Sequence, residues 1–310
     1  MEGTVIKSTG SWYVVSDGEG RLWDCRLRGK IRLDGLRSTN PVAVGDKVVF
    51  EQEPGKETGV IKKIQPRNNV IVRKSVNLSK ASHIIAANID LAIIVATIAQ
   101  PRTSTGFIDR FMVTAEAYHI PVALVFNKCD LYTEDQIGEM AELIGTYSEI
   151  GYPSFGVSAK TGFKLQELKQ LMTGKTCLFA GHSGVGKSAL VNALDPDMQL
   201  RVGEISDVHN KGKHTTTFAE MHRLGFGAWI VDTPGIKEFA LYDMEKETLA
   251  QRFPEMRNLM TECRFANCTH THEPACAVKA AVENGDIAEW RYANYLRMYN
   301  DEDWSYGTDD

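Results

Sequence analysis

A glycine-rich segment, GHSGVGKS, is the part of the chain whose residue types and spacing point most directly to chemistry. It fits the pattern GxxxxGK[ST] completely and lies between a predicted strand over residues 176–180 and a predicted helix over residues 187–194. Glycines let successive backbone N–H groups turn toward phosphate oxygens, and the helix N-terminus adds partial positive charge. Lys187 would then reach the β- and γ-phosphates of a nucleotide, and the Ser188 hydroxyl would bind Mg²⁺. The predicted phosphate-binding residues are Gly181, His182, Ser183, Gly184, Val185, Gly186, Lys187, Ser188 and Ala189.

A second segment suited to the phosphate side, Asp232-Thr233-Pro234-Gly235, follows a predicted strand over residues 228–231. An aspartate at the end of a strand can hold the Mg²⁺ shell, and the Gly235 N–H can meet a γ-phosphate. Alone, these four residues could also form a plain turn. The presence of a phosphate-binding loop in the same chain favours a metal contact at Asp232 and a nucleotide contact at Gly235.

Between these two segments lies a polar stretch, Lys211 to Thr217, with the sequence KGKHTTT. A mobile loop at this place would supply a Thr hydroxyl or carbonyl to Mg²⁺ when a γ-phosphate is present. A polar surface loop is the alternative. We assign the third Mg²⁺ contact to Thr216, although one sequence does not distinguish it from Thr215 and Thr217.

A base-recognition motif, Asn127-Lys128-Cys129-Asp130, follows a predicted strand over residues 122–127. The Asp130 carboxylate can accept two hydrogen bonds from guanine, one from the ring N–H and one from the exocyclic amine. Adenine cannot supply both donors, and such sites discriminate by roughly 10⁴–10⁵. Residues 158–160, again after a strand, would support the base through backbone N–H groups, with an ordinary turn as the alternative. The predicted base-side residues are Asn127, Lys128, Asp130, Ser158, Ala159 and Lys160.

These are the motifs of a GTPase, but their order along the chain is unusual. The base-recognition motifs come first, and the phosphate loop, the threonine-rich stretch and the Asp-Thr-Pro-Gly segment follow. The same sheet can still form if the original ends of a GTPase are joined near residues 172–176. The sequence therefore predicts a circularly permuted GTPase whose last phosphate-side segment leads straight into the C-terminal part.

A cluster of cysteine and histidine residues marks that C-terminal part. Its spacing is Cys263-x4-Cys268-x-His270-x5-Cys276, and three thiolates with one imidazole make a closed tetrahedral set for a structural Zn²⁺. In a reducing compartment such a cluster is a metal site rather than a disulfide framework. Unmetallated cysteines in a helical domain are the alternative, and His272 competes with His270 as the fourth ligand.

The elements that must position these motifs fall into three predicted domains. Residues 1–72 contain short alternating runs broken by turn signals, which predict a small β-barrel of the OB-fold type, an RNA-binding fold. In residues 73–239, strands alternate with helices, so we expect a mostly parallel sheet with helices on both faces. Residues 240–310 lack strand patterns, and two or three helices surround the Cys/His cluster.

Composition places the chain among ordinary soluble proteins, with 310 residues of which 43% are hydrophobic and 24% charged. No apolar run approaches the roughly 18 residues of a membrane span, and the N-terminus lacks a signal peptide pattern, so we expect a cytoplasmic protein without membrane contact. The net charge of -5 argues against a general nucleic-acid binder. Residues 1–75, however, hold 14 Lys and Arg against 9 Asp and Glu, which indicates a local contact with a polyanion.

Basic and aromatic residues gather within the predicted barrel. Basic side chains on such a barrel can follow phosphates while exposed aromatic rings stack on unpaired bases. The alternative is a solvated basic face over an aromatic core, since both tryptophans could be core residues. The residues concerned are Arg21, Arg26, Arg28, Lys30, Arg32 and Arg37, with Trp12, Tyr13 and Trp23.

The order of the motifs together with the Cys/His spacing resembles one family, the bacterial circularly permuted GTPases of the RsgA (YjeQ/YloQ) type. The resemblance implies a late assembly factor that binds the small ribosomal subunit and its rRNA near the decoding region. It implies hydrolysis of GTP to GDP that is stimulated by the subunit, and it favours His270 over His272 as the zinc ligand. We expect a monomer.

One position departs from ordinary switch GTPases, because Ile236 stands where many of them place a water-orienting Gln. His214 is the nearest candidate to act on water, so we assign the catalytic roles to His214 and Lys187; a surface histidine without a role is the alternative. Two other functions compete with the assembly GTPase. One is an rRNA-bound scaffold that holds GTP without significant hydrolysis, and the other is a translation-factor-like GTPase on mature ribosomes.

Overall fold

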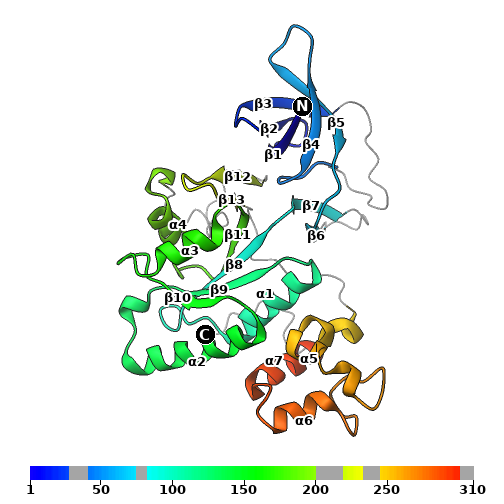
Figure 1. The fold of residues 1–310 in the computed structure, drawn as a ribbon, viewed down its shortest axis with the longest axis vertical. Coiled ribbons are helices and arrows are strands. Elements are labelled where there is room, and N and C mark those ends of the chain that lie inside the picture. The colour runs from blue at the N-terminus through cyan, green and yellow to red at the C-terminus, as the bar shows by residue number, and fades with distance from the viewer. Residues whose placement is uncertain (28–40, 75–81, 200–218, 233–244, 301–310) are drawn as a thin grey trace.

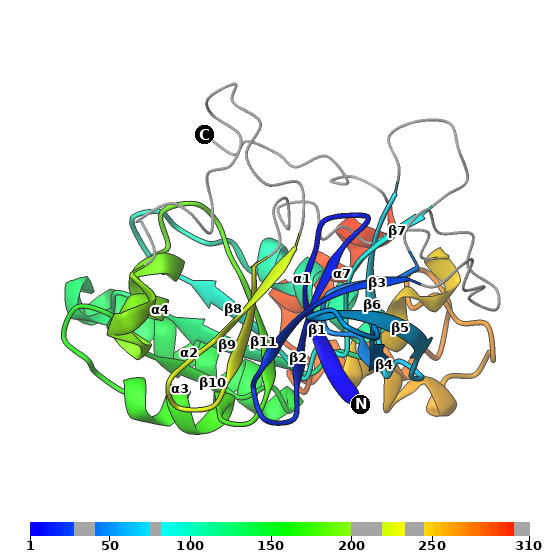
Figure 2. The ribbon, with the colours of Figure 1, turned by 90° about the horizontal axis from the view of Figure 1, so that it is seen from above.

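The computed structural model describes residues 1–27, 41–74, 82–199, 219–232 and 245–300. They form three parts along the long axis of the molecule: an N-terminal barrel, a central sheet with helices, and a C-terminal group of helices (Figure 1). Seen from above, most helices of the central part lie on one side of the barrel, and the orange segments of the C-terminal part lie on the other (Figure 2). None of the helices in these ranges is long and apolar enough to span a membrane.

The N-terminal part is a five-stranded barrel whose strands alternate buried and more exposed residues. The strand order is β1-β2-β3-β5-β4, and β4 pairs back to β1, so this part of the sheet closes on itself. β3 and β5 are parallel and the other pairs antiparallel, which confirms the predicted OB-type barrel. The strands are β1 (Glu2–Ser8), β2 (Tyr13–Asp17), β3 (Leu22–Leu27), β4 (Lys47–Gln52) and β5 (Thr58–Ile64).

The central part is a six-stranded sheet with the order β10-β9-β8-β11-β13-β12. The first five strands are parallel and β12 is antiparallel to its neighbour. The strands are β8 (Leu91–Ala96), β9 (Val122–Phe126), β10 (Ser154–Gly156), β11 (Thr176–Ala180), β12 (Glu220–Arg223) and β13 (Trp229–Asp232). β8 and β9 are buried at every position, as expected for strands covered by helices on both faces.

Two helices cover each face of this sheet. Side chains of one strand face pack with α1 (Thr105–Ala117) and α2 (Glu134–Ile150). Side chains of the opposite face pack with α3 (Leu165–Met172) and α4 (Lys187–Leu194). β11 lies between β8 and β13, although β8, β9 and β10 all precede it in the chain. The strand that leads into the glycine-rich loop, β11, thus lies in the middle of the sheet but follows the base-recognition strands in the chain, as the predicted circular permutation requires.

A hairpin of two strands, β6 (Val70–Lys74) and β7 (Ser82–Ala87), joins the barrel to the central part. The turn before β4 packs against it so closely that a Cβ on Gly45 would lie 2.0 Å from the Ala87 carbonyl oxygen. Gly45 also has a φ of +88°, a backbone conformation that favours glycine independently of this close packing. The predicted domain boundary at residue 72 lies within β6.

A direct strand contact also connects the two sheets. β1 pairs with β12 at Lys7 and Glu220, and the two side chains form an ion pair of 2.9 Å. The barrel and the central sheet are therefore hydrogen-bonded into one continuous 11-stranded sheet.

The C-terminal part consists of short helices that pack on helix α1. Val113 of α1 belongs to the C-terminal core together with Phe253, Met256 and Tyr295. The predicted boundary at residues 239 and 240 lies outside the described residues. The helical elements are η4 (Lys246–Arg252), α5 (Pro254–Arg257), η5 (Met260–Glu262), α6 (Ala277–Glu283) and α7 (Glu289–Tyr299).

A buried polar network fastens this part to α1. Arg291 of α7 and Asp109 of α1 form an ion pair and are 1% and 0% exposed. Glu255 accepts a second bond from Arg291 at 2.5 Å, while Asp109 also accepts from Tyr147 at 2.6 Å and from Asn294 at 2.7 Å. Each charge in the network is thus paired and hydrogen-bonded, as burial requires.

Removing Arg291 should strongly destabilise the protein. An Arg291→Ala variant leaves Asp109 buried without its cation, a change that costs about 3–5 kcal/mol of unfolding free energy. The matched control is Arg257→Ala, because Arg257 pairs with Glu116 at 3.1 Å while 46% exposed. That exposed pair should contribute less than about 1 kcal/mol. Urea denaturation of both variants measures the difference, and equal small losses would contradict a stabilising role for the buried pair.

Candidate nucleotide site and metal cluster

The predicted nucleotide-binding segments meet at one edge of the central sheet. The carboxyl ends of parallel strands lie along the same edge, which is where α/β sheets bind ligands. The base-recognition motif follows β9, residues 158–160 follow β10, the glycine-rich loop follows β11, and Asp232 ends β13. Strand order therefore brings together segments that are far apart in the chain.

The glycine-rich loop has the backbone that a phosphate cradle needs. Gly181, Gly184 and Gly186 have φ values of +142°, +85° and +93°, which side chains disfavour. Lys187 and Ser188 are 5% and 4% exposed at the start of α4. The Lys187 ammonium donates to the carbonyl oxygens of Gly181 and His182, at 2.7 and 2.8 Å, so it already spans the loop.

A buried amide links the base side of the site to the phosphate side. Asn127 is 1% exposed, and its Nδ2 donates to the Val185 carbonyl at 2.9 Å. Its Oδ1 accepts from the Ala159 N–H at 3.1 Å. A Cβ on Gly186 would lie 2.5 Å from the same Nδ2, so a glycine is needed there. One side chain thus holds three loops at fixed distances.

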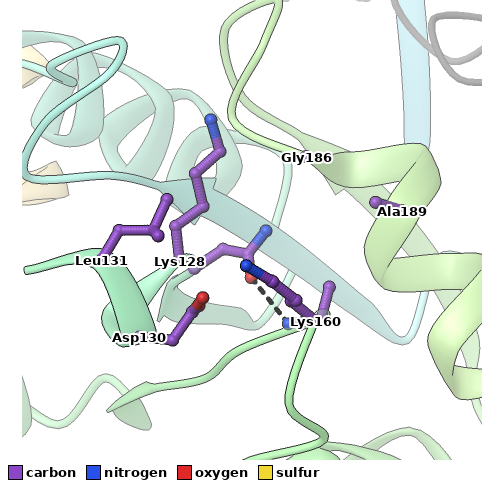
Figure 3. Close-up of a pocket in the computed structure, with 8 residues that line it drawn as sticks. Lys128, Asp130, Leu131, Lys160, Gly186 and Ala189 are labelled. Atoms are coloured by element: carbon purple, nitrogen blue, oxygen red, sulfur yellow. Dashed lines mark hydrogen bonds between the residues drawn. The ribbon is translucent and has the colours of Figure 1, made fainter.

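Between these loops lies a pocket of about 270 Å³, whose walls are drawn in Figure 3. Asp130 is anchored by the Ser158 hydroxyl, which donates to its Oδ1 at 2.6 Å. Lys128 donates to the Gln100 carbonyl at 2.6 Å. The pocket can therefore offer the Asp130 carboxylate to the edge of a base. The apolar parts of other lining side chains, such as Leu131 and Lys160, can cover the faces of that base. The lining residues are Asn127, Lys128, Asp130, Leu131, Ala159, Lys160, Gly186 and Ala189.

Sequence reasoning missed Leu131 as a pocket residue. It is 56% exposed although it is a large apolar side chain, and it lines the pocket directly after Asp130. An apolar side chain at this place can pack on the face of a base. Its position next to the motif was the only signal in the sequence.

On the metal side of the nucleotide site, Ser188 and Asp232 lie on segments at the ends of the adjacent strands β11 and β13. The predicted Thr216, Gly235 and His214 lie outside the described residues, as does Ile236.

The four predicted metal ligands come together in the C-terminal part. One ligand atom from each of Cys263, Cys268, His270 and Cys276 lies within 4.8 Å of all the others. The sulfurs of Cys263 and Cys276 are 4.0 Å apart, near the about 3.8 Å edge of a tetrahedron with zinc–sulfur bonds of about 2.3 Å. His270 Nδ1 lies 3.3 Å from the Cys276 sulfur. All of these cysteines are free of disulfide bonds.

Thiolates in this buried cluster would require a bound cation. His270 is fully buried, and desolvation raises the pKa of the Cys268 thiol to about 12. A thiolate there would need a positive charge beside it, and a divalent metal supplies one. His272 is exposed and hydrogen-bonded to Thr271, so it is not part of the cluster.

Hydrogen bonds from outside the cluster shape the loop that carries His270. The hydroxyl of Tyr292 donates to the His270 carbonyl at 2.5 Å, and that of Tyr295 donates to the Thr269 carbonyl at 2.6 Å. Glu273 accepts from the backbone N–H groups of Thr269, Thr271 and His272. Burial opposes the charged form of Glu273, but the hydrogen bond from the Thr269 hydroxyl, together with the bonds from the backbone N–H groups of Thr269 and Thr271, lowers its pKa to about 2.

The barrel aromatics divide between core and surface. Tyr13 and Trp23 are 1% and 4% exposed and belong to the barrel core, whereas Trp12 is 44% exposed. Arg21 lies over the Trp23 ring at 4.2 Å, and Arg26 pairs with Glu53 at 2.5 Å. Of the three predicted stacking residues, Trp12 alone is thus available for a base. The remaining basic residues, Arg28, Lys30, Arg32 and Arg37, lie outside the described residues.

A phosphate loop, a guanine-type acceptor and a permuted strand order together define a circularly permuted GTPase with an N-terminal OB-type barrel. The family model of the RsgA GTPase matches residues 64–242, and that of the RsgA N-terminal domain matches residues 2–61. The chain belongs to the RsgA GTPase family, which confirms the resemblance found in its motifs.

Similar proteins cover nearly the whole chain. One from Christiangramia forsetii, named small ribosomal subunit biogenesis GTPase RsgA, is 50% identical over 311 residues, covering 100% of this chain and 99% of its own. Another from Bacteroides thetaiotaomicron, named small ribosomal subunit biogenesis GTPase RsgA 2, is 52% identical over 305 residues, covering 98% and 97%.

Solved structures agree with this assignment. YjeQ from Thermotoga maritima matches with a TM-score of 0.80 and 39% identity over 97% of each chain. YloQ, described as a circularly permuted GTPase, matches with a TM-score of 0.76 and 31% identity, covering 97% of this chain and 94% of its own.

An Asp130→Asn variant should lose guanine affinity. The amide keeps an acceptor for Ser158 but can no longer accept two bonds from guanine, and each bond to a charged group contributes about 1.5–3 kcal/mol. The affinity for GTP and GDP should fall by about 10²- to 10⁴-fold, and the affinity for xanthine nucleotides should rise.

Calorimetric titration with GDP and XDP measures this change, with the exposed Asp135→Asn as control. If Asp130→Asn still binds GDP as tightly as the wild type, the pocket does not recognise guanine through this residue.

Proposed function

We propose that this protein hydrolyses GTP to GDP on the small ribosomal subunit and assists a late stage of its assembly, with the subunit stimulating hydrolysis. The observation that carries the proposal is the buried Asn127 amide, which holds the base-recognition motif, the loop at Ala159 and the phosphate loop in one site. The names of the relatives, which describe small-subunit biogenesis GTPases, give the biological setting.

The phosphate side of the mechanism rests on Lys187. Its ammonium donates to two carbonyls of its own loop, so it lies where the loop would place the β- and γ-phosphate oxygens of a nucleotide. Ser188 and Asp232, with Thr216 from the sequence, would hold Mg²⁺, which neutralises charge between the β- and γ-phosphates. Asp130 and Lys128 would orient the base, so the scissile bond is placed by contacts at both ends of the nucleotide.

Water activation is assigned from the sequence. Ile236 cannot orient water, so turnover without the subunit should be slow, and His214 is our candidate for this role when the protein acts on the subunit. GTPase activation by a partner reaches about 10⁵-fold in other systems.

The barrel is our candidate for a contact with rRNA. Trp12 supplies an exposed ring in the turn between β1 and β2, and base–aromatic stacking contributes about 1–3 kcal/mol per base. Arg21 and the basic residues after Leu27 would add phosphate contacts. A cytoplasmic, monomeric protein fits these roles.

The Cys/His cluster is proposed to hold one structural Zn²⁺. Three thiolates and an imidazole fill a tetrahedral shell and leave no open position for a reaction. The metal would fix the loops of the C-terminal part, which the Arg291 network fastens to α1.

GTP turnover measured with and without purified small subunits tests the function. GTP turnover by the wild type should be slow without subunits and should rise when subunits are added. The Lys187→Ala variant should have a stimulated turnover rate at least about 100-fold lower than that of the wild type. Trp12→Ala is the companion variant, with intrinsic turnover unchanged and weaker subunit binding.

A wild-type protein that binds GTP without turnover in either condition would instead be a GTP-holding scaffold. Equal stimulation by mature and immature subunits would favour a role on mature ribosomes.

Metal analysis tests the cluster. We expect one zinc per chain in the wild type and its loss in Cys268→Ser, with the C-terminal part unfolded and nucleotide binding retained. His272→Ala is the matched control, because this histidine lies two residues from a ligand but outside the cluster, and it should keep the metal. Protein purified without chelators that contains no metal would refute the site.

A further inference from the structure

Tyr132 lies two residues after Asp130, where the short 3₁₀ turn η1 (Cys129–Leu131) ends. The side chain is half-buried, and its hydroxyl makes two hydrogen bonds to backbone groups. It donates to the Asn127 carbonyl at 2.5 Å and accepts from the Ile98 N–H at 3.0 Å. The phenol therefore bridges the base-recognition motif and the segment that follows β8.

Both ends of this bridge lead back to the base pocket. Asn127 is the residue whose amide joins the three loops of the site. Ile98 starts the segment that contains Gln100, whose carbonyl accepts from the Lys128 ammonium at 2.6 Å. The base-recognition motif is thus tied to this segment twice, once through the Lys128 side chain and once through the Tyr132 hydroxyl.

The segment after β8 is itself held in shape by local hydrogen bonds. The Thr97 N–H donates to the Thr103 hydroxyl at 3.1 Å, and the Thr97 hydroxyl donates to the Pro101 carbonyl. A segment fixed in this way can hold the base-recognition motif in place. Motion of the base-recognition motif relative to it would break the two bonds of the tyrosine.

A phenol suits this position because it donates and accepts at the same time. Burial raises the pKa of Tyr132 to about 12, so the hydroxyl keeps its proton at physiological pH. A phenylalanine would fill the same space but leave the Ile98 N–H and the Asn127 carbonyl without this partner, and unpaired buried groups are costly.

We propose that Tyr132 is a positioning residue for guanine recognition: its hydroxyl fixes the base-recognition motif against the segment after β8 and so holds Lys128 and Asp130 at the base. The inference rests on the proposed guanine-nucleotide function of the pocket. Tyr132 acts through its neighbours, because it is not among the residues that line the pocket.

The test is a Tyr132→Phe variant of the full chain. The dissociation constants of GTP and GDP should rise by about 10-fold, since two hydrogen bonds that order the loop are lost. The turnover number at saturating GTP should stay within about twofold, because Lys187 and Ser188 are untouched. The affinity ratio of GDP to IDP should also fall, because IDP lacks the exocyclic amine that a correctly placed Asp130 accepts.

Tyr152→Phe is the matched control. The Tyr152 hydroxyl is also buried in the central part and donates to Glu116 at 3.3 Å, but it does not touch the site. This variant should match the wild type in both affinities and in the GDP to IDP ratio. Thermal melts of the two variants record any shared loss of stability.

The outcomes separate the inference from the function it rests on. A wild type that does not bind GDP would refute the proposed function itself. If the wild type binds GDP and Tyr132→Phe has the same affinity and the same GDP to IDP ratio, the positioning role is wrong. An affinity loss that Tyr152→Phe shares to the same extent would also overturn it, since it would reflect stability alone.

Discussion

The nucleotide site depends on one buried amide. Asn127 can donate to the phosphate loop and accept from the loop at Ala159 only because β9, β10 and β11 end at the same edge of the sheet. Close packing around it then leaves no room for a side chain at residue 186. Base pocket and phosphate cradle are thus one rigid unit, in which the distance between the ends of a bound nucleotide is set before the nucleotide arrives.

Helix α1 extends this rigidity to the C-terminal part. Near its start, the Phe107 ring lies against the ring of His182 in the phosphate loop, with centroids 3.9 Å apart. Two residues further along, Asp109 forms the buried ion pair with Arg291, and Val113 belongs to the C-terminal core. A single helix is therefore shared by the phosphate loop, the central core and the metal-bearing part.

The sequence could predict what is local and could not predict what depends on distant partners. The glycine-rich loop, Asp130 and the Cys/His set were recognisable because their chemistry requires fixed spacing, and the strand alternation implied the sheet that positions them. Tyr132 and Arg291 carry no local signal, since one partner of each, Ile98 and Asp109, lies 34 and 182 positions away. The barrel aromatics stayed ambiguous because their burial depends on which face of the closed sheet each one occupies. No pattern in the sequence predicted the pairing of β1 with β12.

The permuted strand order also determines the order in which the parts of the sheet are synthesised and can fold during translation. The barrel strands are complete before the central sheet starts, and domains fold from the N-terminus onward. β8, β9 and β10 then emerge as half a sheet, in which β8 exposes an unpaired edge of the kind that invites aggregation. β11 covers that edge only later, and Asp232 is made last among the described residues of the nucleotide site. A nascent chain therefore cannot gain stability from bound nucleotide until most of it has been synthesised.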